Sequence, residues 1–73
     1  MFIYSIKDEL AQEFGPLFEA KNNDVAERYY NDLVAKTTQP EDYNLYILGE
    51  FDRDTGELKI KKSVIIAGGK TNE

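Results

Sequence analysis

The sequence has no cysteine, no histidine and no tryptophan, and only two prolines among its 73 residues. The lack of cysteine excludes disulfides and thiolate metal sites, and the lack of histidine removes the commonest general base and metal ligand at neutral pH. The usual catalytic dyads and triads of hydrolases are therefore absent. We expect a protein that is not an enzyme and carries no cofactor, and a chain this short to form one domain.

Long apolar segments and an excess of cations are also missing. No apolar run approaches the roughly 20 residues that a membrane-spanning helix needs, and Lys7 and two acids follow the apolar start too soon for a signal peptide. Nine basic against fourteen acidic residues give a net charge of −5, which opposes non-specific attraction to nucleic acid or anionic membranes. Any nucleic-acid binding must come from a local patch, and we expect a cytosolic protein without membrane contact.

Hydrophobic periodicity predicts two strands near the start of the chain. Residues 2–7 alternate between the two faces of a strand. Phe2, Tyr4 and Ile6 share one face, and Ile3, Ser5 and Lys7 share the other. Residues 8–14 predict a helical turn that Gly15-Pro16 ends, and residues 17–21 predict a second, weaker strand.

One amphipathic helix is predicted from about Asp24 to Lys36. Asp24 and Glu27 have the spacing of a capping box, with Asn23 as a competing cap. Pro40 prevents continuation beyond the end. Apolar residues at i, i+4 spacing form one stripe along the helix: Val25, Ala26, Tyr29, Tyr30, Leu33 and Val34. This spacing indicates that the adjacent tyrosines pack in the core and are not stacking rings.

Two more strands are expected in the second half, joined by a tight turn. Residues 43–51 and 57–69 are rich in aromatic and β-branched side chains, and the later strand is expected to bend at Lys62-Ser63. Between them, Asp52 can accept hydrogen bonds from nearby backbone N–H groups and Gly56 can adopt a positive φ. The acids of this turn lack the ligand spacing of an EF-hand, so we expect no metal site.

The predicted element order is β-β-α-β-β, which gives an α+β fold: a four-stranded antiparallel sheet with one amphipathic helix packed on one face. The domain covers residues 1–67, and residues 68–73 form a polar C-terminal tail. A single helix covers only one face of such a sheet, so the other face must contact something else. Because a small core without disulfides or metals often needs a partner subunit, we expect a homodimer.

The uncovered face predicts a site for single-stranded nucleic acid. Lys59 and Lys61 alternate with Leu58 and Ile60, so both lysines face away from the helix if the apolar pair faces it. Cations around an aromatic ring are typical of surfaces where lysines follow the phosphates and a base stacks on the ring. The nominated nucleic-acid-binding residues are Lys7, Tyr46, Lys59, Lys61 and Lys62.

The roles of these residues depend on the strand pattern. Tyr46 is the stacking residue and the four lysines contact phosphate. Lys62 reaches solvent beside Lys61 only if the strand bends there. The alternative is a solvated edge whose lysines block pairing with another strand, or half of a dimer interface.

The order of short motifs along residues 2–59 resembles a known phage family. The chain opens with SIKD, continues with FEAKN and then reads PEDYNLYILGEFDRDTGE. This pattern is similar to the small nonstructural DNA-binding protein of gokushoviruses, which are phages of the microvirus family with single-stranded DNA genomes. The resemblance implies a protein of the host bacterial cytoplasm, absent from the mature virion, that binds single-stranded DNA in genome replication or in the switch to single-strand synthesis and packaging. It transfers no binding residue.

A function of a different class also fits the sequence. An acidic phage protein can bind and modulate a host protein by presenting carboxylates as a mimic of DNA phosphates. Glu27, Asp32, Glu41 and Asp42 would supply those carboxylates. A simple interaction module without a nucleic-acid role is a third interpretation, since an uncovered apolar sheet face alone would explain it.

Overall fold

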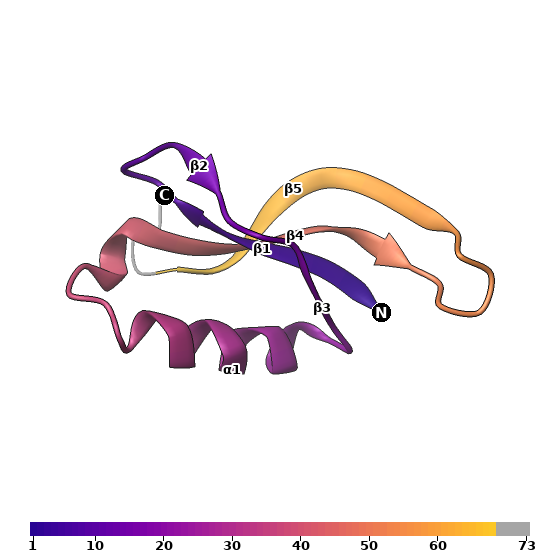
Figure 1. The fold of residues 1–73 in the computed structure, drawn as a ribbon, viewed down its shortest axis with the longest axis horizontal. Helices are drawn as coiled ribbons and strands as arrows, with labels where there is room; N and C mark the ends of the chain where they lie inside the picture. The colour runs from indigo at the N-terminus through magenta and orange to yellow at the C-terminus, as the bar shows by residue number, and fades with distance from the viewer. Residues whose placement is uncertain (69–73) are drawn as a thin grey trace.

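Five antiparallel strands and one long helix make up the structure, which is a computed structural model describing residues 1–68 (Figure 1). The elements in chain order are β1 (Phe2–Asp8), β2 (Glu13–Phe14), β3 (Phe18–Ala20), α1 (Asn23–Val34), the 3-10 helix η1 (Pro40–Asp42), β4 (Tyr43–Phe51) and β5 (Leu58–Gly68). The α+β class, the single helix on one face of an antiparallel sheet and the expected strands are confirmed. The predicted tail begins at the end of β5, and its residues 69–73 lie outside the described part of the chain.

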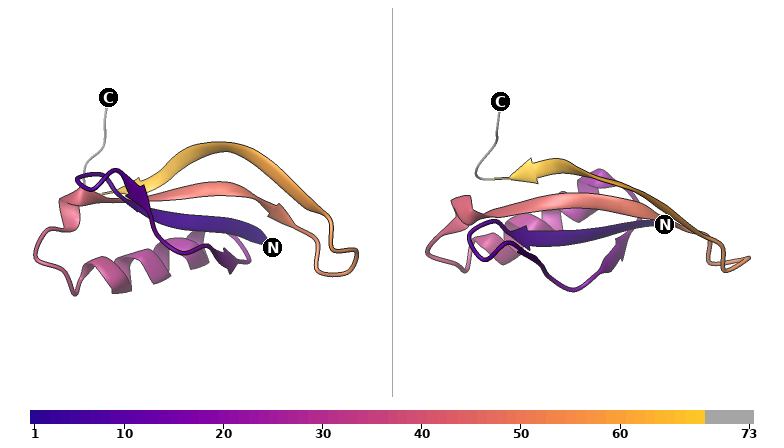
Figure 2. Two further views of the ribbon diagram at one scale, coloured as in Figure 1. Left: turned by 45° about the horizontal axis from the view of Figure 1, so that its top comes forward. Right: turned by 90° about the horizontal axis from the view of Figure 1, so that it is seen from above.

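The sheet is built around the central pair β1 and β4. The strand order is β2-β1-β4-β5, and the short strands β2 and β3 both pair with β1. In the right-hand view of Figure 2, β5 runs along the edge of the sheet farthest from β2 and β3. The hairpin of β4 and β5 projects beyond the end of the helix (Figure 1), so the first half of β5 has no helix packed against it.

The helix begins where an asparagine caps it. The Asn22 side chain accepts a hydrogen bond from the Val25 backbone N–H at 2.9 Å, which satisfies one of the free donors of the first turn. The predicted capping box at Asp24 is therefore wrong by two residues. Asn23, the competing candidate, instead accepts a hydrogen bond from the Tyr4 hydroxyl at 2.8 Å. The helix also ends at Val34, two residues before the predicted end.

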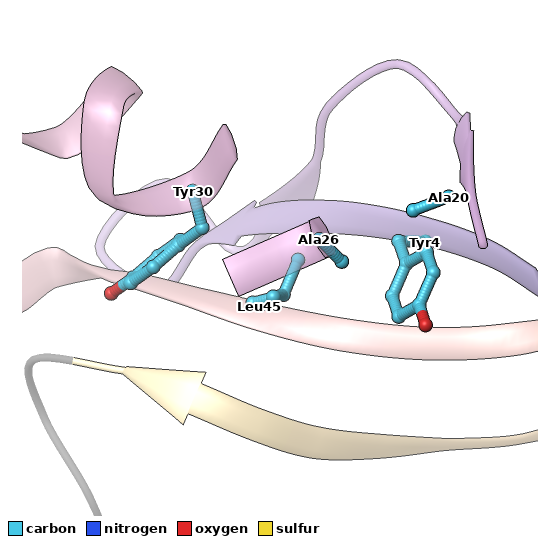
Figure 3. Packing of buried hydrophobic residues seen from close by; sticks show 5 residues of the cluster. All are labelled: Tyr4, Ala20, Ala26, Tyr30 and Leu45. Atoms are coloured by element: carbon cyan, nitrogen blue, oxygen red, sulfur yellow. The ribbon is translucent and has the colours of Figure 1, made fainter. Parts of the chain in front are cut away.

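A small core lies between the helix and the sheet. It consists of Tyr4, Ala20, Ala26, Tyr30 and Leu45 (Figure 3). The two alanines let the backbones approach, and the Tyr30 hydroxyl donates to the Tyr43 carbonyl at 2.6 Å, so its burial leaves no unpaired donor. Core packing is thus confirmed for Tyr30. Tyr29 lies at the edge of the core, 52% exposed, with its ring 4.6 Å from that of Phe18.

The segment predicted as a helical turn forms an extra hairpin instead. The Asp8 carboxylate accepts from the backbone N–H groups of Leu10 and Ala11 at 3.1 and 3.2 Å, which reverses the chain directly after β1. Gln12 takes a positive φ of 61°, and Glu13–Phe14 then pair with β1 as β2. The sheet therefore has five strands where the sequence predicts four.

The turn between β4 and β5 agrees with the sequence. Asp52 Oδ1 accepts from the N–H groups of Asp54 and Thr55 at 2.9 and 3.3 Å. Gly56 has a φ of 80°, which glycine adopts without strain, and its N–H donates to the Asp52 carbonyl at 2.7 Å.

Two predicted side-chain directions are wrong because the strand pairing shifts. Between Ile47 and Gly49 of β4 the partner residue on β5 jumps from Val64 to Ile60, so the bend expected near Lys62 is present. Beyond this shift, Ile60 pairs with Gly49, and Gly49 pairs with Ile3 of β1. All three residues lie on the face of the sheet away from the helix. Leu58 and Ile60 therefore do not face the helix, and Ile60 is 77% exposed. The same shift leaves Phe51 outside the core.

Candidate nucleic-acid interface

The sheet face opposite α1, called here the open face, is partly covered by the segment that contains β2. The Ser5 hydroxyl donates to the Gly15 carbonyl at 2.9 Å, and Ser5 is fully buried as a result. The Gly15 N–H in turn donates to the Ile6 carbonyl at 2.9 Å. The face predicted to be uncovered is thus closed at one end by the chain itself and open along β5.

Glu9 is the centre of a polar cluster on this face. Its Oε2 accepts hydrogen bonds from the Tyr46 hydroxyl at 2.7 Å and from Asn44 Nδ2 at 2.8 Å. Its Oε1 lies 3.4 Å from Lys7 Nζ. These four residues, Lys7, Glu9, Asn44 and Tyr46, are called the Glu9 cluster below.

The sheet register brings the cluster together. Lys7 pairs with Asn44 across β1 and β4, and Tyr46 lies two residues further along β4. Glu9 follows directly after β1, and its backbone N–H donates to the Asp42 carbonyl at 2.7 Å. Two of the nominated residues, Lys7 and Tyr46, are therefore neighbours as predicted. Glu9 and Asn44 were missed, because neither belongs to a recognisable pattern in the sequence.

The cluster changes the acid–base properties of its members. The hydrogen bond from Tyr46, then that from Asn44 and the nearby Lys7, lower the pKa of Glu9, although burial opposes this. Burial and the adjacent Glu9 carboxylate raise the pKa of Tyr46 to about 12. At neutral pH Glu9 is therefore a carboxylate and Tyr46 a neutral phenol.

Phe14 covers the ring of Tyr46. The two rings meet edge to face, with centroids 5.1 Å apart and planes at 65°, and Lys7 Nζ lies 5.3 Å from the centre of the Phe14 ring. Phe14 remains 41% exposed, while Tyr46 is half-buried. The ring that this face presents most openly is therefore Phe14, which the sequence did not single out because a helical turn was expected there.

An apolar groove of about 380 Å³ continues from Phe14 toward β5. Its lining is mainly aliphatic: Ile3, Leu17, Leu48, Leu58 and Ile60. Lys61 also lines the groove. One of the nominated β5 lysines thus lies along the same hollow as the exposed ring.

The three nominated lysines of β5 are all exposed, as the bend allows. Within residues 1–68, none of Lys59, Lys61 and Lys62 forms an ion pair. Their surroundings differ, however. Lys59 pairs with Glu50 in the strand register and lines a separate polar hollow with Asp52 and Asp54. The structure therefore places Lys61 along the groove that Phe14 also lines. Lys59 lies on the opposite side of β5 from Leu58 and Ile60, near the acids of the turn, and so does not face away from the helix as predicted.

Asn44 is 1% exposed, and its Oδ1 has no hydrogen-bond partner among the described residues. It lies opposite Gly68 of β5, where a Cβ would clash with the Asn44 amide. Glycine at position 68 is what allows β5 to pass this side chain.

Neither a metal site nor a membrane span is found in the described part of the chain. No three acidic side chains within residues 1–68 gather closely enough to hold a metal ion. The helices in the same range are too short or too polar to cross a bilayer.

Comparisons with known proteins agree with the resemblance seen in the sequence at the level of the family. The family model described as "Phage ORF5 protein" matches residues 1–72. "Protein ORF5" of Chlamydia phage 1 is 34% identical over 67 residues, which cover 80% of this chain and 70% of the relative. No solved structure matches the chain. The chain therefore belongs to the phage ORF5 protein family and is a small protein of the gokushovirus type.

Proposed function

We propose that this protein binds single-stranded DNA of its phage without sequence preference. It would act as a nonstructural protein in genome replication, or in the switch to single-strand synthesis and packaging, in the cytoplasm of the host bacterium and outside the mature virion. Family membership supports a phage role. The observation that carries the DNA-binding role is the set of three exposed, unpaired lysines on β5, in a protein with a net charge of −5.

The physical basis is a cationic strand beside an exposed ring. Lys59, Lys61 and Lys62 would follow the phosphates, while a base stacks on Phe14, which lines the same groove as Lys61. Tyr46 and Lys7 stay nominated, but their polar atoms are engaged by Glu9 in this conformation. Lysines that contact phosphates read no base edges, so the binding would be weak, tolerant of sequence and sensitive to salt.

Fluorescence anisotropy with a labelled oligothymidylate over a series of salt concentrations tests the proposal. We expect binding at low salt that weakens steeply as salt is added, because bound lysines release counterions from the strand. An oligonucleotide of mixed sequence should bind with similar affinity. The absence of binding at low salt, or an affinity indifferent to salt, would overturn the proposal.

The proposal includes a homodimer formed along the edge of the sheet. Among the strands of residues 1–68, β5 pairs only with β4, and its exposed side chains include Val64 at 53% and Ile65 at 37%. The lysines and the bend protect the first half of β5 against pairing, whereas the apolar second half has no such protection. A second copy related by two-fold symmetry could pair there and leave both sets of lysines accessible.

The alternative function, binding of a host protein as a DNA mimic, has one observation in its favour. Asp32 of α1 and Glu41 of η1 are exposed and form no ion pair within the described residues. A host DNA-binding enzyme that is captured by the protein and released by added DNA would support this function. In that case Asp32→Asn and Glu41→Gln together should abolish the capture.

A further inference from the structure

Three donors of different kinds converge on one carboxylate in the Glu9 cluster. A hydroxyl, a side-chain amide and an ammonium group lie 2.7, 2.8 and 3.4 Å from its oxygens. Hydroxyl, amide and ammonium donors are the groups that proteins use to hold the phosphates of nucleic acids. The Glu9 carboxylate thus occupies a small anion site formed by Lys7, Asn44 and Tyr46.

The Glu9 side chain is able to leave this site without unfolding its surroundings. Its backbone is held separately, through the hydrogen bond from its N–H to the Asp42 carbonyl at 2.7 Å. The side chains of Glu9 and Lys7 are each 21% exposed, so both reach solvent. If the Glu9 side chain rotated away, the three donors would still point at one position. Lys7 would then supply a positive charge there, and the carboxylate would be gone.

Asn44 supplies its donor from a fixed, almost fully buried position. It directs its amide N–H at Glu9, while its Oδ1 lacks a partner among residues 1–68. A buried acceptor without a partner is costly, and it is uncommon in native structures.

We propose that the Glu9 carboxylate is an internal substitute for a DNA phosphate, and that its displacement opens a phosphate site made of Lys7, Asn44 and Tyr46. This inference rests on the proposed function, since the competing ligand is the phosphate backbone of single-stranded DNA. Phe14 lies beside the site, with its ring centre 5.3 Å from Lys7 Nζ. A nucleotide whose phosphate replaces the carboxylate therefore has a ring next to it on which its base can stack.

The consequence is a protein whose own acid competes with DNA. The lysines of β5 make the first contacts, and the Glu9 site adds a further phosphate contact only when the carboxylate is displaced. Competition from the Glu9 carboxylate lowers the affinity of the site for a single free phosphate. A strand that is already held at the lysines competes better, because its phosphates have a high effective concentration near the site.

Glu9→Gln tests the inference, with Glu13→Gln as the matched control. Both variants remove one negative charge from the same hairpin, but Glu13 is exposed and its side chain forms no hydrogen bond or ion pair in the described structure. Glutamine at position 9 keeps an acceptor for Tyr46 and Asn44, so the fold should persist. A thermal melt of each variant verifies this before binding is measured.

Three results in the oligothymidylate anisotropy assay support the inference together. Glu9→Gln binds at least about threefold more tightly than Glu13→Gln, and its salt slope is steeper by about 0.7, the value of one added phosphate contact on a single strand. Adding Lys7→Gln to Glu9→Gln removes both gains. Equal affinities and slopes for the two glutamate variants, when the parent protein binds, overturn the inference alone.

Failure of the proposed function gives a different pattern. If the parent and both glutamate variants all fail to bind oligothymidylate at low salt, the proposed function is overturned and the inference with it. If Glu9→Gln does not fold, a titration of the parent protein with oligothymidylate at low salt replaces it, followed by the side-chain amide signals of Asn44 in an NMR spectrum. Shifts of those signals that saturate support the phosphate site, and unchanged signals overturn it.

Discussion

Replacement of Tyr46 by phenylalanine removes the shortest hydrogen bond in the Glu9 cluster and little else. The hydroxyl donates to Glu9 Oε2 at 2.7 Å, and the ring contact with Phe14 does not depend on it. Hydrogen bonds to charged groups stabilise proteins by about 1.5–3 kcal/mol. Because Glu9 is 21% exposed and keeps its contacts with Asn44 and Lys7, we expect a loss somewhat below this range, about 1 kcal/mol.

The loss should depend on pH in a way that identifies its origin. Glu9 has a pKa below its ordinary value of 4.5, so its contribution to stability is complete above that value and is lost as the pH falls through the folded-state pKa. Tyr46 has a pKa raised from 10.0 to about 12, so its contribution is complete below pH 10 and is lost as the pH rises toward 12. The difference between parent and Tyr46→Phe should therefore be largest between about pH 5 and pH 9 and shrink on both sides.

Thermal or urea unfolding at several pH values measures this difference. A loss of 1 kcal/mol lowers the Tm of a domain this small by about 4–8 °C. Tyr29→Phe is the matched control, since Tyr29 is 52% exposed and we expect its loss to fall within about 0.5 kcal/mol at every pH. If Tyr46→Phe is no less stable than Tyr29→Phe at pH 7, or if its loss is independent of pH, the account of the Glu9 cluster is wrong.

Three further changes test other parts of the account. Gly49→Ala should destabilise the fold by about 1–3 kcal/mol in urea unfolding, because a Cβ at position 49 would clash with the Lys59 carbonyl across the β4–β5 hairpin. A variant as stable as the parent would show that the two strands do not approach so closely. Val64→Lys should convert the proposed homodimer into the 8.4 kDa monomer in sedimentation, because lysine on an edge strand opposes pairing with another copy. If the parent protein is already monomeric at micromolar concentration, the dimer is refuted. Phe14→Ala should weaken oligothymidylate binding at every salt concentration and leave the salt slope unchanged, since stacking releases no counterions. An unchanged affinity would exclude Phe14 as the stacking ring.

Local signals in the sequence were sufficient for the elements whose structure is locally determined. The helix follows from its apolar stripe, and the turn before β5 follows from the Asp52 side chain and the positive φ of Gly56. The hairpin that forms β2 was not predictable in this way. It depends on Gln12 in a conformation that few non-glycine residues adopt, and on pairing with β1.

The candidate site was only partly predictable, because it depends on tertiary contacts. The three β5 lysines are exposed as predicted, but the predicted face is wrong for Lys59. Leu58 and Ile60 face away from the helix, because the pairing shift opposite Leu48 breaks the alternation, so Lys59 between them lies on the helix side of β5. The surroundings of Tyr46 were not visible in the sequence either. Glu9 and Phe14 come from the unexpected hairpin and are brought to Tyr46 only by the fold.

The salt dependence of single-strand binding by Lys59→Gln/Lys61→Gln tests the central claim most directly. The control is Lys21→Gln/Lys36→Gln, which removes the same charge from two exposed lysines outside β5. We expect the β5 double variant to bind single-stranded DNA more weakly than the parent. Its salt slope should be lower by about 0.7 for each lost phosphate contact, hence by about 1.4 for two, while the control keeps the slope of the parent. If the two double variants bind with the same affinity and the same slope at every salt concentration, the lysines of β5 are not the DNA-binding surface.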